Sequence, residues 1–264
     1  MKKVLSLVLA VIMVLSMTAC GGSAGKGDES DVDYIRNKGK LVVGITDFAP
    51  MDYKDDAGDW IGFDADAARI VAKALGVDVE FVEIDWDNKI LELDNKSIDC
   101  VWNGMTLTDE VKNSMECSKP YCNNAQVIVV NADAAANYQD AESAKDLSFA
   151  VESGSAGESA AKEQGYEYTA LASQADTLME VEAGTSDACI IDLLMAGAMI
   201  GEGTSYSDLA YTASLTSEEY GVGCRKGSDL AAFINEQLKS AYEDGSLKDI
   251  ATKYGVQEAL IPIE

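Results

Sequence analysis

Short β-branched runs alternate along most of the chain with stretches whose apolar residues lie three or four positions apart. The first pattern is typical of buried strands and the second of amphipathic helices. In the first half, the patterns predict strands at 40–45, 77–84 and 98–102 and helices at 65–75 and 86–93. A second series predicts strands at 126–130, 147–151, 188–192 and 220–224 and helices at 158–164, 193–200, 229–243 and 247–254. We therefore expect an α/β fold with largely parallel sheets.

The repetition of strand, polar loop and helix predicts two similar lobes. We expect lobe 1 to comprise residues 33–126 plus 222–264, and lobe 2 to comprise residues 127–221. The chain would then cross between the lobes near residues 126–131 and 219–223. Folds of this kind bind small molecules in a cleft at the carboxyl ends of their strands.

The N-terminus has the pattern of an export signal. Lys2 and Lys3 precede an apolar run over residues 4–19, which as a helix would be about 24 Å long, short of the ~30 Å of a bilayer core. We expect residues 1–19 to be a signal peptide. Small residues directly before Cys20 resemble a bacterial lipobox, in which this cysteine is acylated; the alternative is an ordinary secretory signal with a chance cysteine. Residues 20–32, rich in Gly and Ser, would then be a lipidated flexible tether.

Composition narrows the classes of function. The 264 residues include 20 Lys+Arg and 46 Asp+Glu, giving a formal net charge of −26. A chain this acidic repels phosphate backbones and anionic lipid, so we expect no nucleic-acid partner and no membrane contact except through the anchor. The absence of histidine removes the commonest general base and metal ligand. We expect no metal and no cofactor.

Five cysteines follow Cys20, namely Cys100, Cys117, Cys122, Cys189 and Cys224. An odd number cannot all pair within one chain. Each lies in an apolar stretch, which favours buried free thiols, although one disulfide, such as one between Cys117 and Cys122, stays open.

Five segments of the first half, in order and spacing, are similar to polar amino acid-binding proteins, the extracytoplasmic receptors of ABC importers. The segments are 43–47, 62–66, 84–87, 102–108 and 117–121. The resemblance runs from about residue 33 to the C-terminus and implies a two-lobed periplasmic-binding-protein-like fold of type II with a central cleft. It also implies a small-molecule ligand, an ABC transporter permease as partner, a monomer, and a lipid anchor on a cell membrane of the Gram-positive type.

The resemblance assigns acids and aromatic residues to the ligand. Asp192, at the end of a predicted strand, matches the acid that holds the ligand ammonium; its alternative role is to cap the helix that follows. Asp47 matches a ligand-contacting acid of lobe 1. Phe48 matches an aromatic cover, and Trp86 matches a wall of the pocket, with core packing as the alternative for Trp86.

A polar segment of lobe 1 also matches ligand-binding positions. Gly104 and Thr106 match residues that offer a backbone carbonyl, an N–H and a hydroxyl. Trp102, Asn103 and Met105 lie beside them, and the first two could face either the cleft or the core.

The sequence departs from its family where the ligand α-carboxylate should bind. The pattern calls for Arg, whose guanidinium grips a carboxylate bidentately, but Val111 stands there. The second-lobe turn of two hydroxyl residues is reduced to Ser155 followed by Ala156, and Glu152 occupies a position that is basic or neutral in some relatives. The ligand is therefore expected to be an amine, or an amino-acid derivative without a free α-carboxylate, unless Lys89 or Lys112 replaces the missing Arg.

Asp47, Asp192 and Glu152 would hold such a ligand. The leading interpretation is a non-enzymatic protein that captures an amino acid or related amine by closure of two lobes. The rivals are a ligand-binding sensor or scaffold and a dehydratase-like enzyme on the same fold, in which the same acids would do acid–base work.

Overall fold

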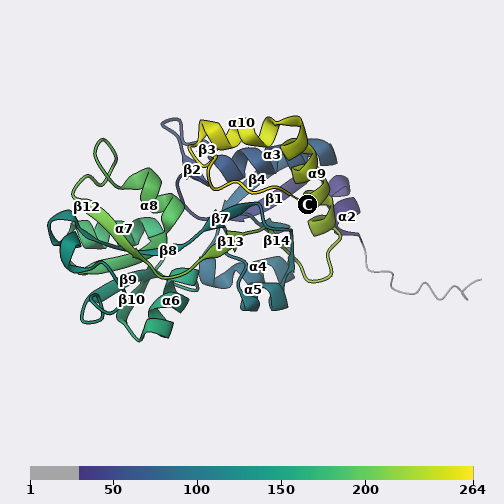
Figure 1. Cartoon of the computed structure of the whole chain (residues 1–264). Helices are drawn as coiled ribbons and strands as arrows, with labels where there is room; N and C mark the ends of the chain where they lie inside the picture. The colour runs from purple at the N-terminus through teal and green to yellow at the C-terminus, as the bar shows by residue number, and fades with distance from the viewer. Residues whose placement is uncertain (1–29, 264) are drawn as a thin grey trace, which may run out of the picture.

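The computed structural model describes residues 30–263, which form two α/β lobes joined by two crossing segments (Figure 1). No helix within this range is long and apolar enough to span a membrane. The predicted signal peptide and Cys20 lie outside the described residues, as does most of the predicted tether. Helix α2 (Asp31–Lys38), with Ser30 as its N-cap, includes the last two residues of the predicted tether, 31 and 32, which are therefore helical.

Lobe 1 is built on a five-stranded sheet in which β1 is parallel to β4 and β5, and β14 is antiparallel to β5 and β6. The strand order is β4 (Asp78–Glu83), β1 (Lys40–Ile45), β5 (Cys100–Val101), β14 (Gly223–Cys224) and β6 (Glu116–Cys117). Helices cover both faces of this sheet (Figure 1). On one side lie α3 (Phe63–Leu75), α9 (Leu230–Asp244) and α10 (Ser246–Lys253), and on the other α4 (Lys89–Asp94) and α5 (Asp109–Ser114). The short helix η1 (Trp86–Asn88) directly precedes α4.

Lobe 2 repeats this plan. Its sheet has β9 parallel to β10 and β11, and β8 antiparallel to β11 and β12. The strand order is β10 (Glu167–Leu171), β9 (Ser148–Glu152), β11 (Ala188–Asp192), β8 (Gln126–Asn131) and β12 (Leu209–Ser214). The helices of this lobe are η2 (Ala132–Asn137), α6 (Ala156–Gln164), α7 (Gln174–Glu182) and α8 (Leu193–Met199).

The two sheets are mixed, so the expectation of largely parallel sheets is wrong. The physical reason is the crossing between lobes: β8 and β14 each enter a sheet directly after the chain has come from the other lobe, and each runs against its new neighbours. Between the lobes, β7 (Cys122–Asn124) pairs antiparallel with β13 (Glu218–Tyr220). The first crossing therefore ends where β8 begins at Gln126, earlier than the expected 126–131, because all of β8 belongs to the lobe 2 sheet.

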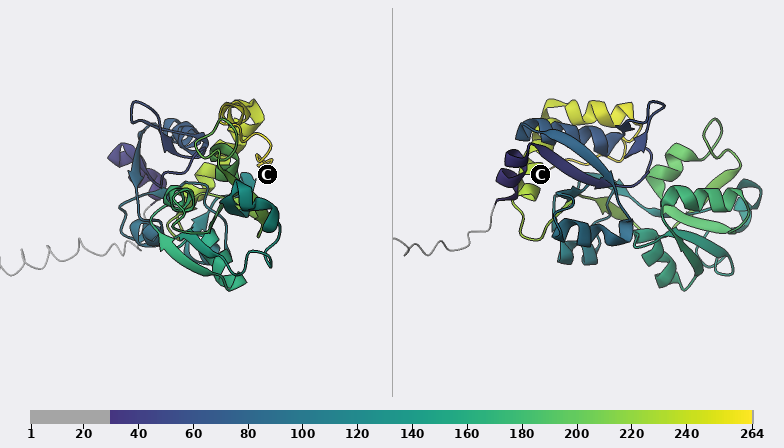
Figure 2. Two further views of the ribbon diagram at one scale, coloured as in Figure 1. Left: turned by 90° about the vertical axis from the view of Figure 1, so that its left-hand side faces the viewer. Right: turned by 180° about the vertical axis from the view of Figure 1, so that it is seen from behind.

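Most predicted elements are present within two residues at each end. The predicted strand at 220–224 is instead divided into β13 and β14. Several elements had no counterpart in the sequence prediction. Among them are the strands β10 and β12, the helix α7, and a hairpin of β2 (Tyr53–Lys54) and β3 (Trp60–Ile61). Figure 2 shows that the first and last helices of the described chain lie in the same lobe, so lobe 1 is completed only after the second crossing.

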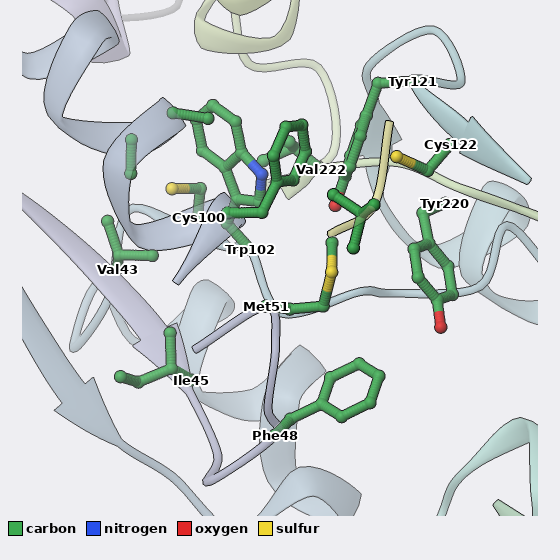
Figure 3. Close-up of a cluster of buried hydrophobic side chains, with 14 of the residues drawn as sticks. Val43, Ile45, Phe48, Met51, Cys100, Trp102, Tyr121, Cys122, Tyr220 and Val222 are labelled. Carbon is green, nitrogen blue, oxygen red and sulfur yellow. The ribbon is translucent and has the colours of Figure 1, made fainter. Parts of the chain in front are cut away.

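Aromatic residues fill the core of lobe 1 next to the crossing segments. Figure 3 shows Trp102, Tyr121 and Tyr220 among apolar side chains, and each of the three is at most 1% exposed. Their rings lie in sequence, with centroids of Trp102 and Tyr121 6.4 Å apart and those of Tyr121 and Tyr220 6.5 Å apart. All five described cysteines are free thiols, and the alternative Cys117–Cys122 disulfide is not formed.

A buried ion pair fastens the N-terminal helix to the rest of lobe 1. The guanidinium of Arg225 donates to Asp31 from Nη2 at 2.8 Å and from Nε at 3.2 Å. Its Nη1 donates to the carbonyl of Ile98 at 2.8 Å and to that of Leu93 at 3.3 Å. One side chain thus connects α2, the end of β14 and the loop between α4 and β5.

Replacing Arg225 with Met should destabilise lobe 1 strongly. The substitution leaves the buried carboxylate of Asp31 without its guanidinium partner and removes the side-chain donor of the Ile98 carbonyl, and removing one partner of a buried pair costs about 3–5 kcal/mol. Urea denaturation of Arg225→Met would measure this loss. The control is Lys40→Ala, which breaks a solvent-exposed pair with Glu80 and should change the free energy of unfolding by at most about 1 kcal/mol. Equal effects of the two substitutions would contradict this assignment.

Candidate functional site

A small cavity lies between the lobes, and both lobes contribute to its wall. Its volume is about 50 Å³, enough for a few water molecules, so a larger ligand can enter only when the lobes separate. From lobe 1 it is lined by Trp86, Lys89, Ile90, Asn103, Gly104, Met105, Thr106, Thr108, Glu110 and Val111. From lobe 2 it is lined by Glu152, Gly154, Ser155, Ala156, Ser159, Gln174 and Asp192.

The lobes touch directly at one end of this cavity. Nζ of Lys89 in lobe 1 donates to the carbonyl of Gly154 in lobe 2 at 2.9 Å and to the carbonyl of Trp86 at 3.1 Å. Gly154 has φ +70°, and a Cβ there would lie 2.6 Å from Oδ1 of Asp87. Glycine is therefore required for this close approach. Of these two bonds, the one to Gly154 joins the lobes, and the one to Trp86 fixes the Lys89 side chain within lobe 1.

Asp192 occupies the end of β11 and is 4% exposed. Its Oδ1 accepts hydrogen bonds from the Asn124 amide, from Nε2 of Gln126 at 3.0 Å and from the Tyr220 hydroxyl at 2.6 Å. Its Oδ2 accepts one from Nε2 of Gln174 at 2.5 Å. Asp192 is the N-cap residue of α8, but its side chain makes no capping hydrogen bond.

Burial and the nearby charge of Glu218 raise the pKa of Asp192 to about 7, against the lowering effect of the donors from Tyr220, Gln174 and Gln126. A carboxyl that receives four neutral donors and is still difficult to ionise indicates a strongly desolvated position.

Glu152 faces the same cavity from the end of β9. It is 3% exposed, and its Oε1 has no hydrogen-bond partner within the described part of the chain. Burial and the Asp192 charge raise the pKa of Glu152 to about 8, opposed by Lys89 and Gln174. The two acids are brought together because β9 and β11 are parallel neighbours, so their carboxyl ends share one edge of the sheet.

The lobe 1 wall of the cavity is held by side chains that are already hydrogen-bonded. Gly104 donates its N–H to Oδ2 of Asp64 at 2.6 Å, so this donor is engaged inside lobe 1 and not offered to the cavity as the sequence suggested. The Asn103 amide donates to Asp52 at 2.9 Å and accepts from the N–H of Thr46 at 3.0 Å. The Thr106 hydroxyl donates to Glu218 at 2.9 Å.

Most of the residues predicted from sequence to bind ligand line the cavity. They are Trp86, Asn103, Gly104, Met105, Thr106, Glu152, Ser155 and Asp192. Trp102 and Phe48 do not line it: Trp102 lies in the core, and Phe48 packs edge-on against Tyr220 with centroids 6.4 Å apart (Figure 3). Asp47 is exposed and also lies outside the cavity wall.

Sequence reasoning missed Gln174, which supports Asp192. Gln174 donates to Oδ2 of Asp192 and accepts the Asp192 N–H at 2.9 Å. It opens helix α7, whose N-cap Ser173 accepts from the N–H of Asp176. The Ser-x-x-Asp spacing is a helix-start signal, which could have located this residue had the preceding strand β10 been recognised.

Among residues 30–263, no unengaged basic side chain lines the cavity where a carboxylate clamp would stand. Val111 lines the cavity from α5 and is 5% exposed. In lobe 2, two N–H groups near the start of α6 are engaged locally, because Gly154 donates its N–H to Glu158 at 2.8 Å and Ser155 accepts the Glu158 N–H. Lys112, the other candidate to replace the clamp, is exposed and outside the cavity wall.

Comparison with known proteins identifies the family. The model of bacterial extracellular solute-binding proteins, family 3, matches residues 41–257. The chain belongs to this family. The solute-binding protein is 31% identical over 263 residues to the arginine-binding extracellular protein ArtP of Bacillus subtilis, covering 96% of this chain and 98% of that protein.

Solved structures of the same kind superimpose well on the solute-binding protein. A variant of ArgBP from T. maritima has a TM-score of 0.80 at 32% identity and covers 85% of this chain and 99% of that one. The ancestral amino acid-binding protein AncCDT-1, a precursor of cyclohexadienyl dehydratase, has a TM-score of 0.78 at 33% identity with coverages of 85% and 99%. The two-lobed fold and the extracytoplasmic solute-binding family predicted from sequence are confirmed.

The cavity acid Glu152 should make the solute-binding protein less stable as the pH rises. The pKa of Glu152 is raised from 4.5 to about 8, so between these values the folded state keeps a proton that the unfolded state releases. The free energy of unfolding then falls with increasing pH by up to about 1.4 kcal/mol per pH unit for this group. Glu152→Gln removes that loss, so its advantage over the wild type should grow from pH 5 to pH 8.

Thermal and urea denaturation across this pH range would measure the difference. Glu163→Gln, which alters an exposed glutamate on α6, is the matched control and should track the wild type. If the free energy of unfolding of Glu152→Gln changed with pH in the same way as that of the wild type, the prediction would be wrong.

Proposed function

We propose that this protein captures a cationic ligand without a free α-carboxylate, an amine or a modified amino acid, and presents it to an ABC transporter permease. The observation that carries the proposal is the charge of the cavity wall. Glu152 and Asp192 face the cavity from lobe 2, and Val111 stands where a carboxylate-binding Arg would be needed. Among the described residues of the wall, Lys89 is the one basic side chain, and it is bonded to two carbonyls.

An unmodified α-amino acid would bring a carboxylate into this acidic, desolvated space. A buried charge that loses its partner typically forfeits about 2–5 kcal/mol, or roughly 30- to several-thousand-fold in affinity. A cation meets the opposite situation, because burial makes the acids unfavourable until a positive charge arrives. ArtP and ArgBP, by their names, bind arginine, which supports recognition of a positively charged ligand by related proteins.

Lobe closure would carry out the capture. Ligand enters between separated lobes, and the contacts of Lys89 with Gly154 and of Gly154 with Asp87 form when the lobes meet. We propose residues 33–126 plus 222–264 and residues 127–221 as the two bodies that move, and a monomer as the working unit. Binding and release without chemical change is the activity proposed, in line with relatives named for binding.

The location proposed is the outer face of a cell membrane of the Gram-positive type. Residues 1–19 would be removed on export, and acylated Cys20 would anchor the domain through the segment that follows. A tether of about 12 residues has a mean reach of roughly 20 Å, which would hold the domain close to a permease in the same membrane.

Calorimetry with matched ligands would test the choice of ligand class. Agmatine and L-arginine differ only in the carboxylate, so agmatine should bind at least about 30-fold more tightly if the clamp is absent. Val111→Arg should narrow or reverse this preference, because it returns a guanidinium to the cavity wall. Val111→Met adds length without charge and serves as the control. Tighter binding of L-arginine than agmatine by the wild type would overturn the proposed ligand class.

A separate experiment addresses the anchor. Expression of the full chain with Cys20→Ala should release the protein from the membrane fraction into the medium and abolish incorporation of radiolabelled palmitate. Cys117→Ala, which alters a half-buried thiol far from the N-terminus in sequence, should leave both readouts unchanged. Wild-type protein that incorporates no palmitate and is itself found in the medium would argue for an ordinary secretory signal with a chance cysteine.

A further inference from the structure

Glu152 differs from every other acid of the cavity wall in having an unengaged oxygen in a buried position. Its Oε1 has no hydrogen-bond partner among residues 30–263, and the residue is 3% exposed. Glu110, the other glutamate of the wall, is exposed to solvent. An unpartnered carboxyl oxygen at this depth is unfavourable by itself, so its position at the cavity indicates a contact completed by the ligand.

Asp192 has much less capacity left for a ligand. An ionised carboxylate offers about four acceptor positions. Oδ1 of Asp192 already accepts from Asn124, Gln126 and Tyr220, and Oδ2 accepts from Gln174. The ligand's strongest open acceptor in lobe 2 is therefore Glu152, although Asp192 is the acid that the family pattern points to.

The charges around Glu152 come from each element packed against it. Asp192 on β11 and Asp176 on α7 are acidic and disfavour its ionised form, whereas Lys89 on α4 and the Gln174 amide favour it. The charges of Glu110, Asp87 and Asp85 also act on Lys89 and favour its charged form. The Lys89 ammonium donates to two carbonyls and forms no ion pair with Glu152 in the described structure. Glu218 on β13 adds negative charge next to Asp192.

We propose that Glu152 holds a proton in the free cavity and exchanges it for the cationic group of the ligand. The proposal rests on the proposed function in requiring a cationic ligand. On binding, the O–H bond of the carboxylic acid breaks and its proton passes to solvent, while the ligand cation takes its place beside the carboxylate. One positive charge enters and one leaves, so the closed cavity never contains an uncompensated Glu152 carboxylate.

The exchange makes affinity depend on pH in a defined direction. Burial, with the Asp192 charge, raises the pKa of Glu152 to about 8. Below this value the ligand must displace a proton, so affinity should rise about tenfold per pH unit, and above it affinity should level off. A wholly structural role for Glu152 would give no such slope.

Calorimetry of agmatine binding in phosphate and in Tris, two buffers with different ionisation enthalpies, measures the number of protons released. Wild-type protein at pH 7 should release about one proton per ligand. Glu152→Gln should release markedly fewer, lose the pH slope, and bind agmatine less tightly than the wild type chiefly above pH 8. Glu163→Gln, the matched change on the exposed side of α6, should behave as the wild type.

The outcomes separate the two proposals. Agmatine binding without proton release would overturn the exchange and leave the proposed ligand class standing. Binding of L-arginine alone would overturn the ligand class, and proton release measured with L-arginine would then support or refute the exchange. If neither probe binds, carboxyl-detected NMR of ¹³C-Glu-labelled protein decides, with the Glu152 signal assigned by its loss in Glu152→Gln. A Glu152 carboxyl that is protonated at pH 7 supports the exchange. A Glu152 carboxyl that is already ionised at pH 6 overturns it.

Discussion

The hydrogen bonds to Asp192 connect the parts of the molecule that must move relative to one another. Asn124 and Gln126 come from the first crossing between lobes and Tyr220 from the second, and all three donate to the same oxygen. A buried carboxyl is tolerated only when such donors surround it, so the acid at the end of β11 fixes the course of both crossings. Tyr220 also packs against Phe48 and Tyr121 in lobe 1, which extends this constraint into the core of the opposite lobe.

This arrangement separates two tasks that one acid would otherwise share. Asp192 organises the crossings. Glu152, one strand away on the same sheet edge, lines the cavity and has an oxygen without a hydrogen-bond partner among the described residues. The parallel pairing of β9 with β11 makes the separation possible, since it places two strand ends side by side. The sign of the cavity is thus set by a few acids at strand ends, while the net charge of −26 resides mainly on residues elsewhere in the chain.

The alternation of strands and helices was enough to predict the two-lobed α/β fold, because each buried run and each amphipathic stretch reports its own local environment. The direction of the strands could not be predicted from local patterns. The strands β8 and β14 run antiparallel to their neighbours because the chain enters each sheet from the other lobe, and that depends on the path of the whole chain. At the site, position along the chain located Gly104 and Thr106 but could not show that their donors were already engaged by Asp64 and Glu218. Such competition between partners distant in sequence is visible only in three dimensions.

Lobe 1 follows the same principle with a second pair of acids. Asp64 accepts hydrogen bonds from the Gly104 N–H and the Tyr121 hydroxyl, and Asp52 accepts one from the Asn103 amide. Both carboxyls are fully buried. Burial, together with the charge of Asp64, raises the pKa of Asp52. These acids hold the backbone that forms the cavity wall and do not reach the cavity themselves. Gly104 is the point where this support meets the site, because at φ +53° a Cβ would lie 2.3 Å from the Phe48 ring. Asp52, Asp64 and Glu152 each have one buried oxygen without a hydrogen-bond partner among the described residues, and of these three acids Glu152 is the one that lines the cavity. In both lobes, then, buried carboxyls position the frame of the site, and Glu152 is the one placed where a ligand can complete its contacts.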